Sequence, residues 1–155
     1  MKIGVVSDTH GRFDSRLESL FEGVDLILHA GDIGKVDVIQ ALERIAPVLA
    51  VEGNNDSFGS YPVTRVEQLE NRTFLIRHIF GEIHQLKAAD HTLIRELKPD
   101  VIVFGHSHRA YREKLGGALL FNPGSAGPKR FSLPRTAGLL LLDDSGVEAR
   151  ILPLE

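Results

Sequence analysis

The sequence predicts an α/β protein in which two packed, mixed β-sheets are flanked by helices. Up to residue 51, short apolar runs alternate with amphipathic runs at helical spacing, which is typical of a parallel sheet covered by helices. Two more strand-like runs, one more helical run and one more apolar run follow up to residue 104. Beyond it only strand-like runs and hairpin turns remain, so we expect the chain to end in antiparallel strands.

The first part of the chain is expected to form a β-α-β-α-β unit, because its apolar residues change between strand-like runs and helical spacing. In order, the expected elements are a strand from Lys2 to Val6, a helix from Phe13 to Phe21, a strand from Leu26 to Leu28, a helix from Val36 to Ile45 and a strand from Val48 to Val51. Successive strands joined by helices lie parallel in one sheet.

The remaining elements complete the two sheets. We expect strands from Thr64 to Leu69 and from Thr73 to Arg77, a helix from Ala88 to Leu97 that Pro99 ends, and a buried strand from Val101 to Phe104. Four strands should follow, from Arg109 to Lys114, Ala118 to Phe121, Ala137 to Leu142 and Val147 to Leu152, with hairpin turns at Gly116-Gly117 and Asp143 to Gly146. No linker or repeat interrupts this order, so residues 1–155 are expected to form one domain.

Composition excludes several classes of function. The 155 residues include no cysteine, so disulfides, thiolate zinc sites and thiol nucleophiles are excluded, and any metal must bind His, Asp, Glu or Asn. A net charge of -3 gives no general attraction to extended nucleic acid or to anionic membranes. No segment has the pattern of a signal peptide or the length of a membrane span, so we expect a cytoplasmic protein.

Potential metal ligands follow five of the expected strands. They are Asp8 and His10, then Asp32, then Asn54, then His78, and finally His106 and His108. Side chains two residues apart on an extended segment point the same way, so Asp8 and His10 can share one ion, and His106 and His108 have the same spacing. Since ligands bind beyond the carboxyl ends of strands in open α/β sheets, the sequence predicts one composite site.

In this order, the motifs resemble those of the calcineurin-like metallophosphoesterase family. They read Asp8-Thr9-His10, Gly31-Asp32, Gly53-Asn54-Asn55-Asp56, His78 and Gly105-His106-Ser107-His108, with Asn122-Pro123-Gly124-Ser125 further along the chain. The resemblance covers the whole chain and is greatest to the small, cap-less bacterial and archaeal phosphodiesterases. It implies that the two sheets and their helices form the four-layer α/β/β/α sandwich of that family.

The resemblance also implies a dinuclear metal centre. Asp8, His10 and His108 would bind the first ion, Asn54, His78 and His106 the second, and Asp32 would bridge the two. Carboxylate, amide and imidazole ligands together suit divalent transition metals, with Mn²⁺ favoured and Ni²⁺, Co²⁺, Fe²⁺ or Zn²⁺ as alternatives. In such a centre a metal-bridging hydroxide attacks the phosphorus, which makes Asp32, Asn54 and His106 the residues expected to take part in catalysis.

These features predict a metal-dependent phosphodiesterase that hydrolyses small phosphate esters. A chain of 155 residues has no room for a separate cap, so the open site should accept small phosphodiesters or cyclic nucleotides. Phosphomonoesterase activity is a close alternative. A non-catalytic or weakly catalytic protein-binding scaffold, like the retromer subunit that resembles this family, is the alternative from another class. The sequence is also compatible with a homo-oligomer.

The histidine that follows the fourth of these five strands departs from the family pattern. His78 is followed by Ile79 rather than by glycine, and His84 stands six residues further on. We expect His78 to be the ligand because it ends a strand-like run. His84 and His91 are expected to be surface residues.

The residue after the asparagine ligand also departs from the pattern. Phosphatases of this superfamily often carry a proton-donating histidine there, but this chain has Asn55, whose amide cannot protonate a leaving alkoxide. Asp56 is expected to orient a ligand or its loop. His29 is expected to be a hydrogen-bonded histidine near the core that does not bind metal.

Overall fold

Ten strands form two five-stranded sheets in the computed structural model, which describes residues 1–57 and 59–155. The first sheet has the order β10-β9-β1-β2-β3, formed by β1 (Lys2–Val6), β2 (Leu26–His29), β3 (Val48–Ala50), β9 (Thr136–Asp143) and β10 (Gly146–Pro153). The second has the order β4-β5-β6-β8-β7, formed by β4 (Thr64–Leu69), β5 (Arg72–Arg77), β6 (Val101–Val103), β7 (Tyr111–Leu115) and β8 (Ala118–Asn122). Both sheets are mixed, because each joins parallel neighbours to antiparallel ones.

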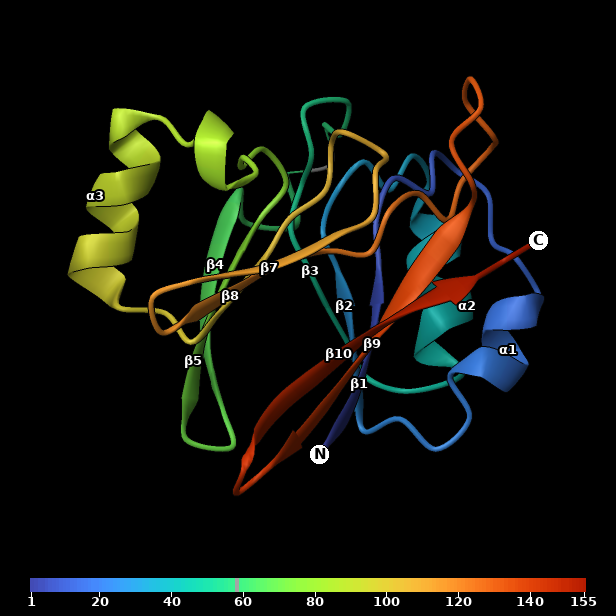
Figure 1. Ribbon diagram of the computed structural model, residues 1–155. Helices are drawn as coiled ribbons and strands as arrows, with labels where there is room; N and C mark the ends of the chain where they lie inside the picture. Colours follow the sequence, from blue (N-terminus) through green and yellow to red (C-terminus); the bar gives the residue numbers. More distant parts are fainter. Residues whose placement is uncertain (58) are drawn as a thin grey trace.

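Helices cover the outer face of each sheet (Figure 1). Helices α1 (Arg16–Leu20) and α2 (Val36–Glu43) pack on the first sheet, and α3 (Ala88–Leu97) with the 3₁₀ helix η1 (Ile83–Gln85) packs on the second. A third apolar cluster fills the space between the sheets. The predicted class of two packed, mixed sheets between helices is therefore confirmed. Within the described residues, none of the helices is long and apolar enough to cross a bilayer.

Successive side chains of a strand point to opposite faces of its sheet, and this alternation produces the layers. On β1, Ile3 and Val5 point into the space between the sheets, whereas Val6 packs with the residues of α1 and α2. Gly4 also faces these helices, where the ring of Phe21 lies 2.9 Å from the position that a Cβ atom would take. A glycine at this position therefore lets α1 pack directly on β1.

The expected antiparallel strands at the end of the chain are present, but one of them also has a parallel neighbour. β8 forms the expected hairpin with β7 but pairs in parallel with β6 on its other side. The β9–β10 hairpin returns to the first sheet, where β9 pairs antiparallel with β1. Turn residues fix the local pairing within a hairpin, whereas the outer neighbour of a hairpin depends on long-range packing that no local pattern reveals.

Helix α1 begins later than the predicted Phe13 because Asp14 is held by side chains from elsewhere. Its carboxylate pairs with Arg135 at 2.8 Å and accepts a hydrogen bond from the backbone N–H of Arg16 at 3.0 Å. Arg135 is only 4% exposed and also donates to the carbonyl oxygens of Ala126 and Gly127. This buried ion pair therefore ties the start of α1 to the loop that follows β8.

Replacing Asp14 by Asn should lower the free energy of unfolding by about 3 kcal/mol at neutral pH, because Arg135 would keep a buried charge without its counter-ion. Hydrogen bonds from Arg16 and then from Arg135 hold the pKa of Asp14 well below its usual range. A depressed pKa stabilises the fold above the unfolded-state pKa of about 3.9, and this stabilisation is lost as the pH falls. Urea unfolding of wild type and variant from pH 7 to pH 3 would measure the difference.

The difference in the free energy of unfolding between wild type and Asp14→Asn should be constant near neutrality and shrink below about pH 4. Glu148→Gln is the control, because Glu148 pairs with Arg150 on the exposed surface and should contribute little at any pH. A difference that does not change with pH would contradict a contribution from the Asp14 charge.

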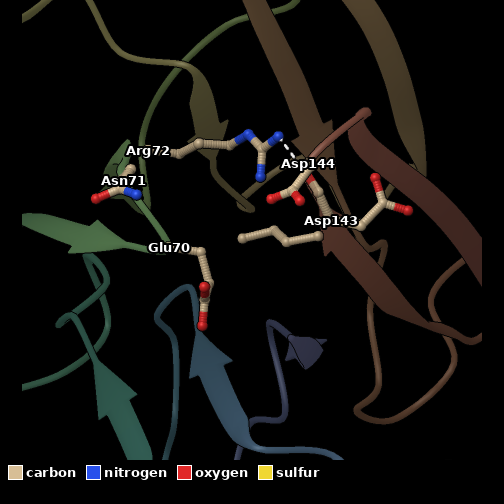
Figure 2. A pocket seen from close by; sticks show the side chains of 6 residues that line it. Glu70, Asn71, Arg72, Asp143 and Asp144 are labelled. Carbon is tan, nitrogen blue, oxygen red and sulfur yellow. Dashed lines mark hydrogen bonds between the residues drawn. The ribbon is translucent and has the colours of Figure 1, made fainter.

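A cavity of about 250 Å³ lies at the end of the sheets where β1 and β5 begin (Figure 2). The β4–β5 turn and the β9–β10 turn enclose it, and Arg72 reaches across to donate to the backbone oxygen of Asp143 at 2.6 Å. Asp143 and Asp144 line the same cavity. The predicted metal ligands follow the opposite ends of the strands, so this cavity is remote from them.

Candidate metal centre

The loops after β1, β2, β3, β5 and β6 meet at one edge of the molecule, the upper edge in Figure 1. Backbone hydrogen bonds join them in pairs. Asp8 N–H donates to Gly31 O at 2.9 Å and His10 N–H to Asp32 O at 3.0 Å. Gly105 N–H, which precedes the last pair of histidines, donates to His78 O at 3.1 Å. These bonds join loops within each sheet, and the N–H of His106, which donates to Asp8 Oδ2 at 3.1 Å, connects the loops of the two sheets.

The first group of potential ligands consists of Asp8, His10 and His108, whose donor atoms all lie within 4.8 Å of one another. Asp8 Oδ1 is 3.8 Å from His10 Nε2 and 3.3 Å from His108 Nε2. The two Nε2 atoms are 3.3 Å apart. Ligands bound to one ion at about 2.1 Å lie roughly 3.0–3.4 Å from each other, so the three atoms are spaced much as ligands of a single ion are.

The second group consists of Asp8, Asp32 and His78. His78 Nε2 lies 3.7 Å from Asp8 Oδ1 and 3.3 Å from Asp32 Oδ2. Asp32 Oδ2 is also 3.8 Å from His10 Nε2, in the first group. Both carboxylates therefore face histidines of both groups, and all three members of the second group are at most 2% exposed.

Three buried atoms in this centre lack a hydrogen-bond partner, namely Asp8 Oδ1, His78 Nε2 and His108 Nδ1, and the first two face each other. The other polar atoms of Asp8 and His78 are used. Asp8 Oδ2 accepts from Ser7 Oγ at 2.7 Å and from the N–H of His106 at 3.1 Å, and His78 Nδ1 lies 2.7 Å from Ala30 O. A carbonyl only accepts, so the proton is on Nδ1 and the Nε2 lone pair is free. That is the arrangement of a metal-binding histidine.

Asn54 and His106 lie beside the second group but contact each other. Asn54 Oδ1 is 3.1 Å from His106 Nδ1, and the rings of His106 and His78 stack edge to face with their centroids 5.3 Å apart. His106 is exposed, unlike His78. The structure thus brings His106 next to His78 and Asn54 next to His106, and His106 belongs to neither ligand group.

The backbone at the centre differs from the extended geometry that we predicted. Five of the seven candidate ligands have a positive φ: Asp8 (55°), His10 (46°), Asp32 (55°), His106 (73°) and His108 (61°). The argument that alternation on an extended segment aligns Asp8 with His10 was therefore wrong. A left-handed conformation costs a non-glycine residue about 1 kcal/mol or more, and the bonds between loops hold it in place.

Glycines in the motifs allow their neighbours to approach closely. A Cβ atom on Gly53 would lie 2.1 Å from Asp32 Oδ1, and one on Gly105 would lie 2.0 Å from Ser7 Oγ and 2.8 Å from Asp8 Oδ2. Any side chain there would displace a carboxylate of the centre.

Asn55 holds the Asp32 carboxylate, a role that the sequence did not suggest. Its backbone N–H donates to Asp32 Oδ1 at 3.0 Å, and its amide Nδ2 donates to Oδ2 at 2.8 Å. Asp56 accepts hydrogen bonds from the backbone N–H groups of Gly53 and Ile33, at 2.8 and 3.1 Å. The loop after β3 therefore orients Asp32 and is itself tied to the loop after β2.

His29 joins the first two loops from inside the core, where it is completely buried. Its Nδ1 accepts from the N–H of Gly31 at 3.1 Å, so the proton is on Nε2, which lies 2.9 Å from Thr9 Oγ1. Thr9 Oγ1 in turn donates to Ile33 O at 2.9 Å. Burial lowers the pKa of His29 to about 4, so the ring is neutral at physiological pH and positions the loops by hydrogen bonding.

The electrostatics of the centre suit a cation. Burial alone would raise the pKa of Asp32, but its close contact with His78 and the hydrogen bonds from Asn55 hold it well below its usual range. Asp8 behaves likewise, since interactions with His108 and His78 outweigh the effect of burial on its pKa. Burial lowers the pKa of His10, and Asp32 and Asp8 counteract this effect. Two ionised carboxylates consequently face the imidazoles at neutral pH.

Two observations complete the site. The positive charge of Arg130 helps to lower the pKa of His10, so this cation acts on the centre although sequence reasoning did not single it out.

His84 has a side chain that is 75% exposed and faces Glu82, 3.8 Å away, and it belongs to neither ligand group. His91 is exposed on α3.

Comparison with known proteins gives consistent matches along the whole chain. The family model described as the calcineurin-like phosphoesterase superfamily domain matches residues 1–145. A probable metallophosphoesterase of Methanothermobacter thermautotrophicus is 35% identical over 161 residues, which cover 98% of this chain and 92% of that protein. The solved structure of an archaeal phosphodiesterase has a TM-score of 0.77 at 25% identity, with 98% and 100% of the two chains covered. Vps29 of Entamoeba histolytica, solved with zinc, shares the fold at a TM-score of 0.77 and 22% identity, with 100% of each chain covered.

Proposed function

The chain belongs to the calcineurin-like phosphoesterase superfamily, and on this premise we propose that it is a metal-dependent phosphodiesterase with a dinuclear centre. The observation that carries the proposal is that Asp8 Oδ1 and His78 Nε2, two buried atoms that face each other 3.7 Å apart, both lack a hydrogen-bond partner. Leaving such atoms unpaired is costly unless a ligand completes the site. Relatives named as phosphodiesterase and probable metallophosphoesterase support the reaction class.

The two ligand groups, with Asn54 and His106 beside His78, support an assignment of residues to the two ions. Asp8, His10 and His108 would hold the first ion, His78 with Asn54 and His106 would hold the second, and Asp32 would lie between them. When bound, the ions would supply an activated water and neutralise charge on the phosphate. Hydrogen bonds from neighbouring residues orient these ligands. Asn55 donates to Asp32, and Ser7 donates to Asp8. The backbone oxygen of Ala30 accepts from His78.

Two features favour a diester with an acidic leaving group. Asn55 is occupied with the Asp32 carboxylate, so neither its chemistry nor its position allows it to protonate a leaving alkoxide. His106 and Asn54 are exposed at the surface, so a phosphate with two substituents can reach them. Activated aryl phosphodiesters are therefore the appropriate test substrates.

Metal removal and reconstitution test the proposal. Protein treated with a chelator should not hydrolyse bis(4-nitrophenyl) phosphate, and loading with Mn²⁺, Ni²⁺, Co²⁺ or Zn²⁺ should restore the activity. Because the seven side chains exceed what one ion can take, elemental analysis should find about two equivalents of metal per chain. The same samples assayed with 4-nitrophenyl phosphate would compare diester with monoester.

Each outcome separates one alternative. A maximum of one equivalent would refute the dinuclear centre. Two equivalents without turnover under any metal would favour a protein-binding scaffold, the role that the sequence left open. Faster hydrolysis of the monoester than of the diester would make the protein a phosphomonoesterase.

A further inference from the structure

Two cavities adjoin the side of the metal centre where His78 and His106 lie. The smaller, of about 140 Å³, is lined in part by Asn54 and His78. The larger, of about 370 Å³, is lined in part by His106. Arg77 and Ile79 contribute to the walls of both, so the segment that carries His78 separates them. A phosphate at the centre would thus have a hollow on either side.

The larger cavity has the size and the apolar surface of a small-molecule site. Its volume falls within the range of about 300–1,000 Å³ that is typical of ligand pockets. Ile79 and Phe80 form part of its wall, and Ile79 is 45% exposed. An exposed isoleucine next to a polar centre leaves an apolar surface that a ring of the substrate can cover.

The same cavity carries an excess of positive charge. Arg77 and Lys87 line it, with Asp90 as the one carboxylate among the described lining residues. Asp90 already accepts a hydrogen bond from the backbone N–H of Lys87 at 3.0 Å, where it caps the start of α3. The Lys87 side chain is exposed, so its ammonium group is available to an anion. An apolar wall beside two cations suits a group that combines a ring with a negative charge.

We propose that this cavity binds one ester substituent of the diester and that this substituent is a nucleotide carrying a second phosphate. The inference rests on the proposed phosphodiesterase function and adds its substrate class. The ring lies against Ile79 and Phe80, and the second phosphate lies near Lys87 and Arg77. The smaller cavity beside Asn54 leaves space for a compact substituent only.

Three substrates with the same leaving group test this assignment. They are ethyl 4-nitrophenyl phosphate, thymidine 5′-(4-nitrophenyl phosphate) and its 3′-phosphorylated form. In each, water supplies the oxygen that bonds to phosphorus as the bond to nitrophenolate breaks, so the products differ only in the retained substituent. On the metal-loaded protein, kcat/KM should rise about tenfold from the ethyl to the thymidine ester, and about tenfold again with the 3′-phosphate.

Two variants separate the contributions of shape and charge. Ala89 lines the cavity and is exposed, so the larger side chain of Ala89→Phe should fill the space. In this variant, kcat/KM for both thymidine esters should fall to the value for the ethyl ester. Lys87→Gln should lower kcat/KM about tenfold for the 3′-phosphorylated ester alone. Neither variant should change hydrolysis of the ethyl ester. The controls are His91→Phe, on the same helix outside the lining, and Arg72→Gln, which removes a cation from the remote cavity of Figure 2.

The outcomes distinguish this inference from the function on which it rests. No hydrolysis of any of the three esters under any metal would refute the phosphodiesterase function. Equal kcat/KM for all three esters, or losses in Ala89→Phe no larger than those in His91→Phe, would overturn the nucleotide site and leave the function standing.

Discussion

Asp32→Asn is expected to lower the rate of phosphodiester hydrolysis by about 10³-fold. Loss of a residue that merely supports a metal ligand costs about 10–100-fold, and Asp32 faces histidines of both ligand groups, so the cost should be larger. The substitution keeps the size of the side chain and removes its negative charge. The rate should be measured with bis(4-nitrophenyl) phosphate, and elemental analysis of the same sample should show loss of at least one metal equivalent.

Asp144→Asn is the matched control, because Asp144 is an exposed carboxylate in the remote cavity and should affect neither quantity. If Asp32→Asn kept two metal equivalents and a rate within tenfold of wild type, Asp32 would not lie between the two ions. Loss of activity with full metal content would instead give Asp32 a role in binding substrate.

His78→Gln should reduce the rate by about 10²–10³-fold, whereas His84→Gln should leave it within about twofold of wild type. Glutamine keeps much of the volume of histidine but lacks the Nε2 lone pair that faces Asp8 and Asp32. His84 belongs to neither ligand group and is 75% exposed. Activity and metal content of the two variants, measured side by side, give the comparison.

Thermal unfolding of both variants would show whether a loss of activity follows from unfolding, since His78 is buried and packs against Gly31. A large loss in His84→Gln with a normal His78→Gln would reverse the assignment of these two histidines.

Much of the architecture could be predicted from local patterns. The expected strands Lys2–Val6 and Thr64–Leu69 and the helix Ala88–Leu97 agree with the structure at both ends. Their hydrophobic periodicity and bounding residues are local properties, which a sequence shows directly. The gathering of polar residues followed from the order of strand ends, because parallel strands present their carboxyl ends to one edge.

The conformation of the site could not be predicted in the same way. The left-handed backbone at Asp8 and His10 depends on hydrogen bonds to Gly31 and Asp32, which belong to another segment. The hydrogen bond from the Asn55 amide to Asp32 is likewise a contact between loops that are distant in sequence. Local patterns place a residue on an element, but they do not reveal which partner from another segment sets its dihedral angles.

The pairing of β1 affects how the protein folds while it is being synthesised on the ribosome. β1 is synthesised well before β9, one of its two partners, because the strands from β2 to β8 lie between them in the sequence. Until that hairpin leaves the ribosome, one edge of β1 stays open, and an open strand edge can pair with a neighbouring nascent chain. The loop with Asp8 and His10, which extends from β1, therefore gains its complete support only after β9 has been synthesised.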